Sequence, residues 1–476
     1  MKVLFATAEC WPFVKTGGLG DVSYALPKAL KKEGVDVRVI LPKYSTIPNY
    51  LKEKLKTIAV FNVSVAWREQ YCGLLETEID EVKFYFIDNE HYFKRDNTYI
   101  YGYGDDCERY AFFNEAILKA MSILDFYPDT LQLNDWHTGL LPLLLKKRYA
   151  YGKYKDIKTV YTIHNLLYQG VFSEDNYSNV VDCDGFYQDI EYFGGLNFMK
   201  CGISLADKVT TVSPTYSGEI QTDFYGETLN RLLSSKNYKL SGILNGIDYD
   251  LNNPENDDNI YQNYNIENVH TKKVENKLAL QKELGLEVNK DIPMIGIISR
   301  LVSQKGLDLI SCVMPQIMSQ NVQVVVLGTG EQRYESMFNH FSRENPNKLF
   351  AAITFDASLA QKIYASTDMF LMPSLFEPCG IGQLIAMRYG SLPIVRETGG
   401  LKDTIIPYNE YTNEGDGFSF KNYNAHEMLS TIEYAVKTYH NNRKSFNELV
   451  LNAMKKDNSW EKSVKDYKTL YNNLCK

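Results

Sequence analysis

The stretch Met372-Pro373-Ser374-Leu375-Phe376-Glu377-Pro378-Cys379-Gly380-Ile381-Gly382-Gln383 carries the clearest structural pattern in the chain. Residues 368–371, directly before it, are apolar after the first and predict a short buried strand. From Leu384 the apolar residues continue at helical spacing, and we expect Pro378 to be the first helical residue because its fixed φ suits that position. A strand, a glycine turn and a helix in this order are typical of a parallel α/β sheet.

The same stretch suggests chemistry at the turn. Gly380 and Gly382 would let a ligand approach backbone N–H groups at the start of the helix, where the helix dipole favours an anion. A carboxylate at Glu377 beside such a site requires something cationic opposite it, and a sugar carbon that loses a diphosphate develops that charge. The stretch alone leaves open a simpler alternative, in which the turn is purely structural and the acid has no role.

Two more glycine turns share this character. Glu397-Thr398-Gly399-Gly400-Leu401-Lys402-Asp403 follows an apolar strand at 393–395, and Lys15-Thr16-Gly17-Gly18-Leu19-Gly20-Asp21 lies near the N-terminus. With these motifs the chain resembles the glycogen/starch synthase family, and the resemblance runs through nearly its whole length. It implies an α/β fold of the GT-B type, in which two Rossmann-like, doubly wound parallel-sheet domains face each other across a cleft.

Length and pattern set the expected domains. A chain of 476 residues exceeds the usual size of one hydrophobic core. We expect an N-terminal Rossmann-like domain at 1–245 and a C-terminal Rossmann-like domain at 246–456, beginning with a polar loop. An amphipathic helix is expected at 457–476, and the resemblance implies that it returns to the first domain. The resemblance also assigns glucose and acceptor to the first domain and the sugar nucleotide to the second.

Composition excludes several classes of function. The net charge of −8 disfavours nucleic acid and anionic membranes as partners. The apolar run at the N-terminus is short and lacks a cleavage-type flank, so we expect a strand there and no signal peptide, and no 18-residue uncharged apolar window predicts a membrane span. The eight cysteines are scattered without a C-x-x-C pair, which favours reduced thiols over disulfides or a zinc site. We therefore expect a cytoplasmic protein.

The N-terminal glycine loop differs from known phosphate-binding fingerprints. It is neither G-x-G-x-x-G nor a Walker A motif, which disfavours a dinucleotide oxidoreductase. Lys15 ahead of paired glycines can place a charge on a phosphate or sugar, although a tight turn with a solvated lysine fits equally well. A helix is expected over 21–32, kinked or shortened at Pro27. The resemblance implies that this loop faces the sugar nucleotide, with the contacts made by Lys15, Thr16, Gly17, Gly18 and Asp21.

Polar residues end two strands of the first domain. Asp135 follows the strand at 131–134, and His164 and Asn165 follow the strand at 159–163. Ligands bind at the carboxyl ends of parallel strands. The alternatives are that Asp135 caps the next helix and that His164 is structural. The resemblance places Asp135 and His164 beside the transferred glucose and implies substrate-binding roles for Asn165 and for Asn245 at the domain boundary.

The second domain carries a possible diphosphate site. Arg300 and Lys305 follow the strand at 292–299, and from one loop they can converge on the same diphosphate. Two solvated surface cations are the alternative. Phe355 follows another strand and offers a stacking face for adenine, although the family has glycine and tyrosine where this chain has Thr354-Phe355. Gly382 replaces a threonine or asparagine of the family, which removes a side-chain contact but leaves the backbone groups.

The resemblance thus implies a retaining hexosyltransferase that moves glucose from ADP-glucose to the non-reducing end of an α-1,4-glucan such as glycogen. The implied catalytic residues are Asp135, His164, Arg300, Lys305 and Glu377. The implied donor-side contacts are Phe355, Cys379, Gly380, Ile381 and Gly382. No D-x-D-type motif indicates a metal, and no cofactor is expected. The alternatives are a GT-B transferase that uses UDP-glucose or a small acceptor, and a catalytically inactive glucan-binding protein; the sequence leaves the oligomeric state open.

Overall fold

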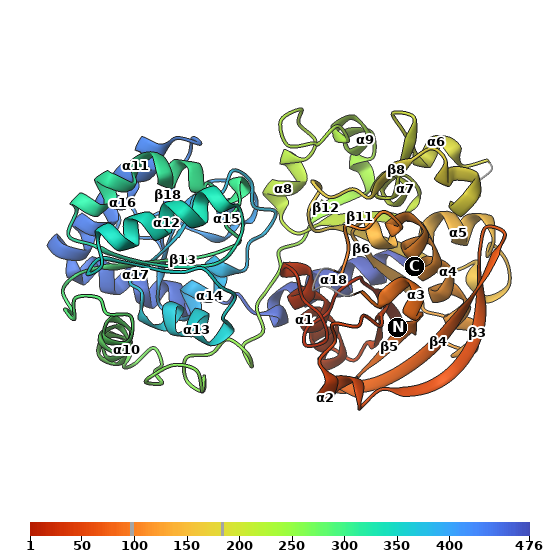
Figure 1. The fold of residues 1–476 in the computed structure, drawn as a ribbon, viewed down its shortest axis with the longest axis horizontal. Coiled ribbons are helices and arrows are strands. Elements are labelled where there is room, and N and C mark those ends of the chain that lie inside the picture. The colour runs from red at the N-terminus through yellow and green to blue at the C-terminus, as the bar shows by residue number, and fades with distance from the viewer. Residues whose placement is uncertain (96–99, 182–184) are drawn as a thin grey trace. The chain divides into compact units, whose positions relative to one another are not determined.

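The computed structural model describes residues 1–95, 100–181 and 185–476. The described chain divides into two compact units. Unit 1 comprises Met1–Asn245 and Trp460–Lys476, and unit 2 comprises Gly246–Ser459. Each unit is a sheet with helices packed on it (Figure 1), as predicted for an α/β fold.

Unit 1 is built on a nine-stranded sheet within the described residues, in the order β12-β11-β7-β6-β1-β2-β5-β4-β3. Its parallel part contains β1 (Lys2–Ala6), β2 (Asp36–Pro42), β5 (Val82–Asp88), β6 (Thr130–Asn134), β7 (Lys158–Ile163), β11 (Lys208–Thr211) and β12 (Leu240–Gly242). The antiparallel strands β3 (Lys56–Val65) and β4 (Arg68–Ile79) extend one edge. They pair with each other as a hairpin, and β4 pairs in turn with β5.

The described α-helices in the first segment of unit 1 are α1 (Gly18–Lys32), α2 (Asn49–Lys52), α3 (Glu90–Phe93), α4 (Asp106–Ile123), α5 (Leu141–Lys147), α6 (Tyr187–Ile190), α7 (Phe198–Leu205), α8 (Pro214–Glu219) and α9 (Asn230–Ser235). Helix α1 runs through Pro27 to Lys32, so the expected shortening at this proline is wrong. Pro27 is buried, and burial of the helix face outweighs the one missing backbone hydrogen bond.

A small second sheet adjoins the main one. Its strands β8 (Val171–Ser173), β10 (Gly195–Asn197) and β9 (Glu191–Tyr192) pair antiparallel in that order. Helix α7 continues directly from β10, and Asn197 caps it by accepting a hydrogen bond from the backbone of Lys200. The small sheet is therefore built from residues that lie between β7 and α7 in the chain.

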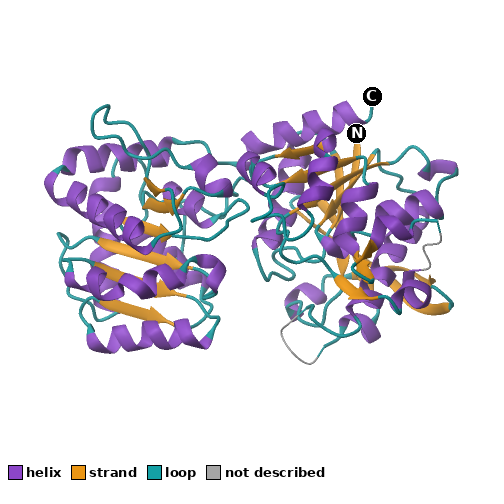
Figure 2. Ribbon diagram, turned by 90° about the horizontal axis from the view of Figure 1, so that it is seen from above, coloured by secondary structure: helices purple, strands orange, loops and turns teal. Residues whose placement is uncertain are grey.

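Unit 2 is a six-stranded parallel sheet in the order β15-β14-β13-β16-β17-β18. The strands are β13 (Met294–Ile298), β14 (Gln323–Leu327), β15 (Leu349–Ala352), β16 (Met369–Met372), β17 (Leu392–Arg396) and β18 (Phe418–Phe420). Helices α11 (Leu307–Ser319), α12 (Gln332–Glu344) and α16 (Ala425–Asn441) lie on one face, and α13 (Ala357–Ser366), α14 (Gly382–Arg388) and α17 (Arg443–Lys455) on the other (Figure 1). Seen from above, the stacked parallel strands and flanking helices are plain (Figure 2). The doubly wound arrangement predicted for this unit is confirmed.

Two further helices of unit 2 are α10 (Val269–Glu283) and the short α15 (Gly399–Thr404). The predicted strand before the organising stretch is confirmed as β16. The helix after it begins at Gly382 and not at Pro378, so that expectation is wrong. Gly380 has a φ of 75°, in the left-handed region, and a right-handed helix cannot pass through it.

The C-terminal segment forms the predicted amphipathic helix, α18 (Trp460–Leu474). Its buried face carries Trp460, Val464 and Tyr467, which pack in the same hydrophobic cluster as β1, β2 and α1. Unit 1 is thus completed by the two ends of the chain. Among the described residues, no helix has the length and apolar character needed to cross a membrane.

Candidate active site

Lys305 and Glu377 form a close ion pair in unit 2. Lys305 ends the turn that follows β13, and its Nζ lies 2.6 Å from Glu377 Oε2. Ser374 Oγ donates a second hydrogen bond to the same carboxylate oxygen over 3.0 Å. Both side chains are largely buried, with 18% of Lys305 and 8% of Glu377 exposed. The group that faces Glu377 in the protein is therefore the ammonium of Lys305.

The glycine turn after β17 holds the backbone of Glu377 in place. Gly400 N donates to Glu377 O over 3.1 Å. A Cβ at Gly399, where φ is 44°, would lie 2.0 Å from Glu377 O, and one at Gly400 would lie 2.2 Å from Cys379 O. Real side chains do not fit at these distances. Glycine is therefore needed at positions 399 and 400, because this turn packs directly against the backbone of Glu377 and Cys379.

Two more contacts hold the residues before Glu377. Arg396, at the end of β17, donates from Nε to Ser374 O over 2.9 Å. Leu375 N donates to Gln304 O over 2.9 Å, which ties this loop to the turn that carries Lys305. The backbone that carries Glu377 is therefore held by hydrogen bonds from Arg396 Nε and Gly400 N and by the one between Leu375 N and Gln304 O.

The glycine-rich residues after Glu377 lead into α14. Cys379 is buried, and its carbonyl accepts a hydrogen bond from Gln383 Nε2 over 2.9 Å. A Cβ at Gly382 would lie 3.2 Å from the Phe370 ring and 3.3 Å from the Tyr364 hydroxyl. A side chain at this position would therefore pack tightly against both rings. Ile381 directly precedes the helix as its N-terminal cap residue.

Two predicted residues of unit 2 lie apart from these contacts. Arg300 is exposed after β13, and its guanidinium forms no ion pair within the part of the chain that the structure describes. Phe355 lies after β15 and is 83% exposed. Both side chains are therefore accessible to a ligand at the carboxyl ends of the strands.

In unit 1, Asp135 binds the backbone that follows β7. Its Oδ1 accepts hydrogen bonds from His164 N over 2.7 Å and Asn165 N over 3.4 Å. It makes no side-chain cap for the turn Trp136–Thr138, so the capping alternative is wrong. The reason is the register of β6 beside β7, which places Asp135 next to the end of the neighbouring strand. Asp135 also has a φ of 55°, a disfavoured value for a non-glycine residue.

Burial decides the charges at these strand ends. It raises the pKa of Asp135 to about 7, although the two amide hydrogen bonds act in the opposite direction. Burial lowers the pKa of His164 to about 3, so its ring is neutral at physiological pH. His164 Nε2 lies 2.9 Å from Asn134 Oδ1. The site thus presents a neutral imidazole and a carboxyl group whose pKa is close to neutral pH.

The N-terminal glycine loop at 15–21 packs on a buried acid, Glu9, that sequence reasoning missed. Glu9 is buried and accepts hydrogen bonds from Thr16 N and from Thr16 Oγ1, the latter over 2.9 Å. Burial raises its pKa to about 7. Its only signal in the sequence is an acid directly after an apolar strand. In the same loop Lys15 Nζ pairs with Asp21 Oδ1 at 2.7 Å, so this lysine is not simply a solvated cation.

The remaining predicted residues occupy simpler positions. Gly17 is the extended residue before α1 and Gly18 is the first residue of that helix. A Cβ at Gly17 would meet nothing within 4 Å, so space alone does not require this glycine. Asn245 is the last residue of the first segment of unit 1. It is buried, and its Oδ1 has no hydrogen-bond partner among the described residues.

The predicted residues therefore form three local groups. Lys305, Glu377 and the 379–382 turn lie together in unit 2. Asp135, His164 and Asn165 share one set of hydrogen bonds in unit 1, and residues 15–21 form another around Glu9 and Thr16. Each group lies at the carboxyl ends of parallel strands, where α/β proteins bind ligands.

Comparison with known proteins agrees with this arrangement. A family model described as starch synthase catalytic domain matches residues 2–235, and one described as glycosyl transferases group 1 matches residues 282–450. A glycogen synthase of Clostridioides difficile is 63% identical, and one of Bacillus cereus is 50% identical; each alignment covers all of both chains.

Solved structures show the same fold. The catalytic domain of starch synthase IV from Arabidopsis thaliana, bound to ADP and acarbose, superposes with a TM-score of 0.93 at 32% identity and covers 100% of this chain and 99% of that one. A sucrose-phosphate synthase from Thermosynechococcus elongatus, at 15% identity and a TM-score of 0.63, shares the fold alone. The chain belongs to the glycogen/starch synthase family of GT-B glucosyltransferases.

Proposed function

We propose that this enzyme transfers glucose from ADP-glucose to the 4-hydroxyl at the non-reducing end of an α-1,4-glucan, with retention of configuration. The observation that carries the proposal is the buried Lys305–Glu377 pair, held by the glycine turn at 399–400. The pair places a cation and an acid in one fixed site. The proposed reaction requires both, because it creates an anionic leaving group and a cationic sugar carbon.

The proposed roles follow from charge and exposure. Arg300 and Lys305 bind the diphosphate of the donor, and Glu377 binds glucose hydroxyls and offsets the positive charge at C1. The exposed ring of Phe355 stacks on adenine. Asp135 and His164 bind the glucose, and the turns at 15–21 and 379–382, with Asn165 and Asn245, complete the contacts. The starch synthase structure bound to ADP supports an adenine donor.

In the proposed reaction the bond between C1 and the diphosphate breaks, and its electron pair leaves with ADP. The acceptor 4-oxygen bonds to C1 on the same face, and its proton passes to the departing phosphate oxygen. Lys305 stabilises the negative charge that develops there. The described cysteines are free thiols, which supports a location in the cytoplasm; Cys183 lies outside the described residues.

The donor is tested by initial rates of glucose transfer to glycogen from labelled ADP-glucose and labelled UDP-glucose at equal concentration. We expect ADP-glucose to react faster, because the proposed site holds an adenine ring on Phe355. A higher rate with UDP-glucose would reject the donor assignment. An absence of transfer from both donors would reject the proposed reaction.

The catalytic pair is tested by Lys305→Met and Glu377→Gln. Each substitution keeps the size of the side chain and removes its charge. We expect kcat to fall by about 10²–10³-fold for Lys305→Met, because one fixed donor to the leaving group is lost. The matched control is Lys455→Met, an exposed lysine on α17 of the same unit. Near-normal rates in both site variants, with the fold intact by circular dichroism, would contradict the assignment.

A further inference from the structure

Gln383 is a fully buried polar residue beside the glycine turn at 379–382, and the proposed reaction gives it no role. It is the second residue of α14. Its Nε2 lies 2.9 Å from Cys379 O, 3.2 Å from Gly380 O and 3.3 Å from Thr404 Oγ1. Carbonyl oxygens only accept hydrogen bonds, so the atom that faces them is the amide nitrogen of Gln383 and not its oxygen. The side chain therefore donates to two successive carbonyls of the turn.

These hydrogen bonds fix the direction of the peptide groups that follow Cys379 and Gly380. Both peptide bonds are trans, and in a planar trans peptide group the C=O and the N–H point in opposite directions. Because the two carbonyls point inward at Gln383, the N–H groups of Gly380 and Ile381 point away from it. Neither N–H donates to a group in the described part of the chain, and both residues are half-buried. Two amide donors are thus presented on the accessible side of the turn.

The conformation of Gly380 and the position of Gln383 depend on each other. Gly380 has a positive φ, and a Cβ there would lie 2.4 Å from Gln383 Oε1. This oxygen is buried and has no hydrogen-bond partner among the described residues. An unpaired buried oxygen costs free energy, which an apolar side chain of the same length would avoid. Stability alone therefore does not explain a glutamine at this position.

Gln383 also connects this turn to the one that holds Glu377. Thr404 Oγ1 donates to Gly400 O over 2.5 Å, which leaves the hydroxyl oxygen to accept from Gln383. Gly400 N in turn donates to Glu377 O over 3.1 Å. One buried amide is thus linked both to the outward N–H groups and to the backbone of the proposed catalytic acid.

We propose that Gln383 is a positioning residue that holds the N–H groups of Gly380 and Ile381 outward, where they bind the diphosphate of the donor. The inference rests on the proposed function and names what orients the amides of that site. Because Gln383 is buried, it touches no substrate and acts through the two peptide groups. Donors that are fixed before the anion arrives bind it without the cost of reorientation.

The test compares Gln383→Met with the wild type in the full-length enzyme, by titration calorimetry with ADP and with adenosine. Methionine keeps the length of the side chain but donates no hydrogen bond. We expect the Kd for ADP to rise by about tenfold, the usual effect of losing one well-oriented hydrogen bond to a charged group. The Kd for adenosine, which lacks both phosphates, should not change. An unchanged Kd for ADP, or an equal rise for both ligands, would overturn the proposal.

Gln383→Glu tests whether a donor is what the turn needs. The three groups that face the side chain, two carbonyls and a hydroxyl, are uncharged, and burial raises the pKa of such a carboxyl. While protonated it donates one hydrogen bond, and once ionised it only accepts. Relative to wild type at the same pH, the Kd for ADP should be nearly normal at about pH 6 and should rise toward about pH 9. A Kd at the lower pH as high as that of Gln383→Met would overturn the proposal.

Gln281→Met is the matched control, because Gln281 is also fully buried in unit 2 and donates from Nε2 to Asn289 O over 2.9 Å. It bonds to Gln323 at the start of β14, the opposite end of the strand from the edge where ligands bind. Its loss should lower stability and leave both Kd values unchanged. An equal rise in the Kd for ADP would overturn the proposal, because the effect would then be unspecific.

The titrations also separate failure of this inference from failure of the proposed function. If the wild type binds ADP with the same Kd as Gln383→Met, the positioning role is rejected, whether or not glucose is transferred. If the wild type binds ADP more tightly than Gln383→Met but transfers no glucose from ADP-glucose, the proposed reaction is rejected and the role of Gln383 in binding the diphosphate stands. A wild type that binds no ADP would reject both.

Discussion

Glu9 and Asp135 show how burial sets the behaviour of single residues near the proposed site. They follow the neighbouring strands β1 and β6, and burial raises the pKa of each to about 7. The charge of Glu9 also raises the pKa of Asp135. Hydrogen bonds from Thr16 to Glu9 lower its pKa but do not offset the loss of hydration. The two carboxyls therefore lose their protons at a pH at which exposed acids are already ionised.

The pKa of Glu9 has a measurable consequence for stability. Between pH 4.5 and 7 the folded protein holds a proton on Glu9 that the unfolded chain has released. Stability therefore falls as pH rises through this window, by about 3 kcal/mol from this residue, and stays low above it. We expect Glu9→Gln to be less sensitive to pH, because glutamine keeps an oxygen that accepts from Thr16 and has no charge to bury.

Denaturant unfolding followed by tryptophan fluorescence measures this effect, because all four tryptophans belong to unit 1. Wild type and Glu9→Gln are compared at pH 5 and pH 8. Identical pH dependence in the two proteins would show that Glu9 is ionised throughout the range and would contradict the prediction. Glu33→Gln, a substitution of an exposed acid on the same unit, serves as the control.

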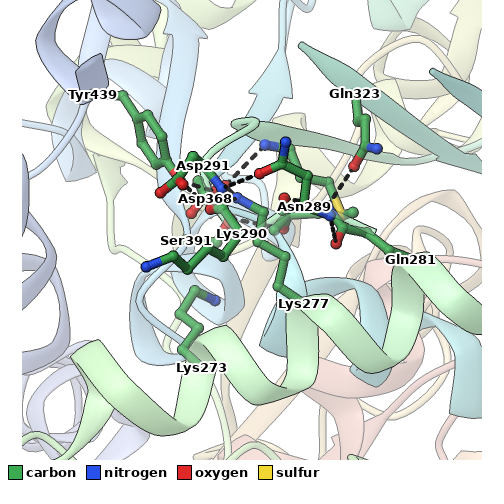
Figure 3. A network of polar contacts seen from close by, with 12 residues as sticks. Lys273, Lys277, Gln281, Asn289, Lys290, Asp291, Gln323, Asp368, Ser391 and Tyr439 are labelled. Carbon is green, nitrogen blue, oxygen red and sulfur yellow. Dashed lines mark hydrogen bonds and ion pairs between the residues drawn. The ribbon is translucent and has the colours of Figure 1, made fainter. Parts of the chain in front are cut away.

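At the scale of elements, α10 is held to unit 2 by lysines that point inward (Figure 3). Lys273 is buried, and its Nζ donates to the carbonyls of Tyr364, Ala365 and Tyr389 at 2.9, 3.1 and 2.8 Å. These carbonyls end α13 and α14, where helices carry partial negative charge. One turn later Lys277 pairs with Asp368 at 2.7 Å. The Lys273 amine thus joins the ends of two helices, and its burial there lowers its pKa to about 7.

We expect Lys273→Met to destabilise unit 2 by about 1–3 kcal/mol, the usual cost when buried carbonyl groups lose a hydrogen-bond donor. Methionine fits the space and removes one donor from each of the three carbonyls, although Tyr264 Oη still donates to Tyr389 O over 2.7 Å. Hydrogen exchange in α13 and α14 measures the change, since tryptophan fluorescence does not report on unit 2. The matched control is Lys282→Met, an exposed lysine on the same helix. Equal protection in both variants would show that the carbonyls find other donors.

At the scale of the whole molecule, the core of unit 1 depends on the far end of the chain. Trp460, Val464, Tyr467 and Tyr471 of α18 are buried in the cluster that contains β1 and α1. Tyr471 Oη donates to Gln132 Oε1 on β6 over 2.8 Å. All of unit 2 lies between these partners in sequence. Unit 1 therefore cannot complete its core until the whole chain has been made.

Truncation after Ser459 tests this dependence. Burial of four large side chains contributes about 6–12 kcal/mol as an upper bound, which is comparable with the total stability of a domain. We expect unit 1 of the truncated protein to be unfolded or to unfold at far lower denaturant, by fluorescence of the remaining tryptophans. A chain that ends at Leu474 is the control and should behave as wild type. Normal unfolding of the shorter chain would disprove the dependence.

The sequence by itself determined the order of elements. Apolar runs predicted the buried strands, glycine turns marked their ends, and amphipathic spacing predicted α1 and α18, because these signals act between residues close in the chain. The same local logic failed at Pro378, which suits a helix start but precedes a left-handed glycine. The family, and with it the fold, was also recognisable from the motifs at 15–21, 372–383 and 397–403.

Only the tertiary structure decided which side chains meet. Lys305 and Glu377 are 72 residues apart, and they pair because β13 and β16 are neighbours in the sheet. The need for Gly399 and Gly400 follows from the approach of β17's turn to the backbone of Glu377 and Cys379. The sequence also did not reveal that Glu9 and Lys273 are buried. Burial and charge pairing depend on strand order and helix packing, which bring together residues that no local pattern connects.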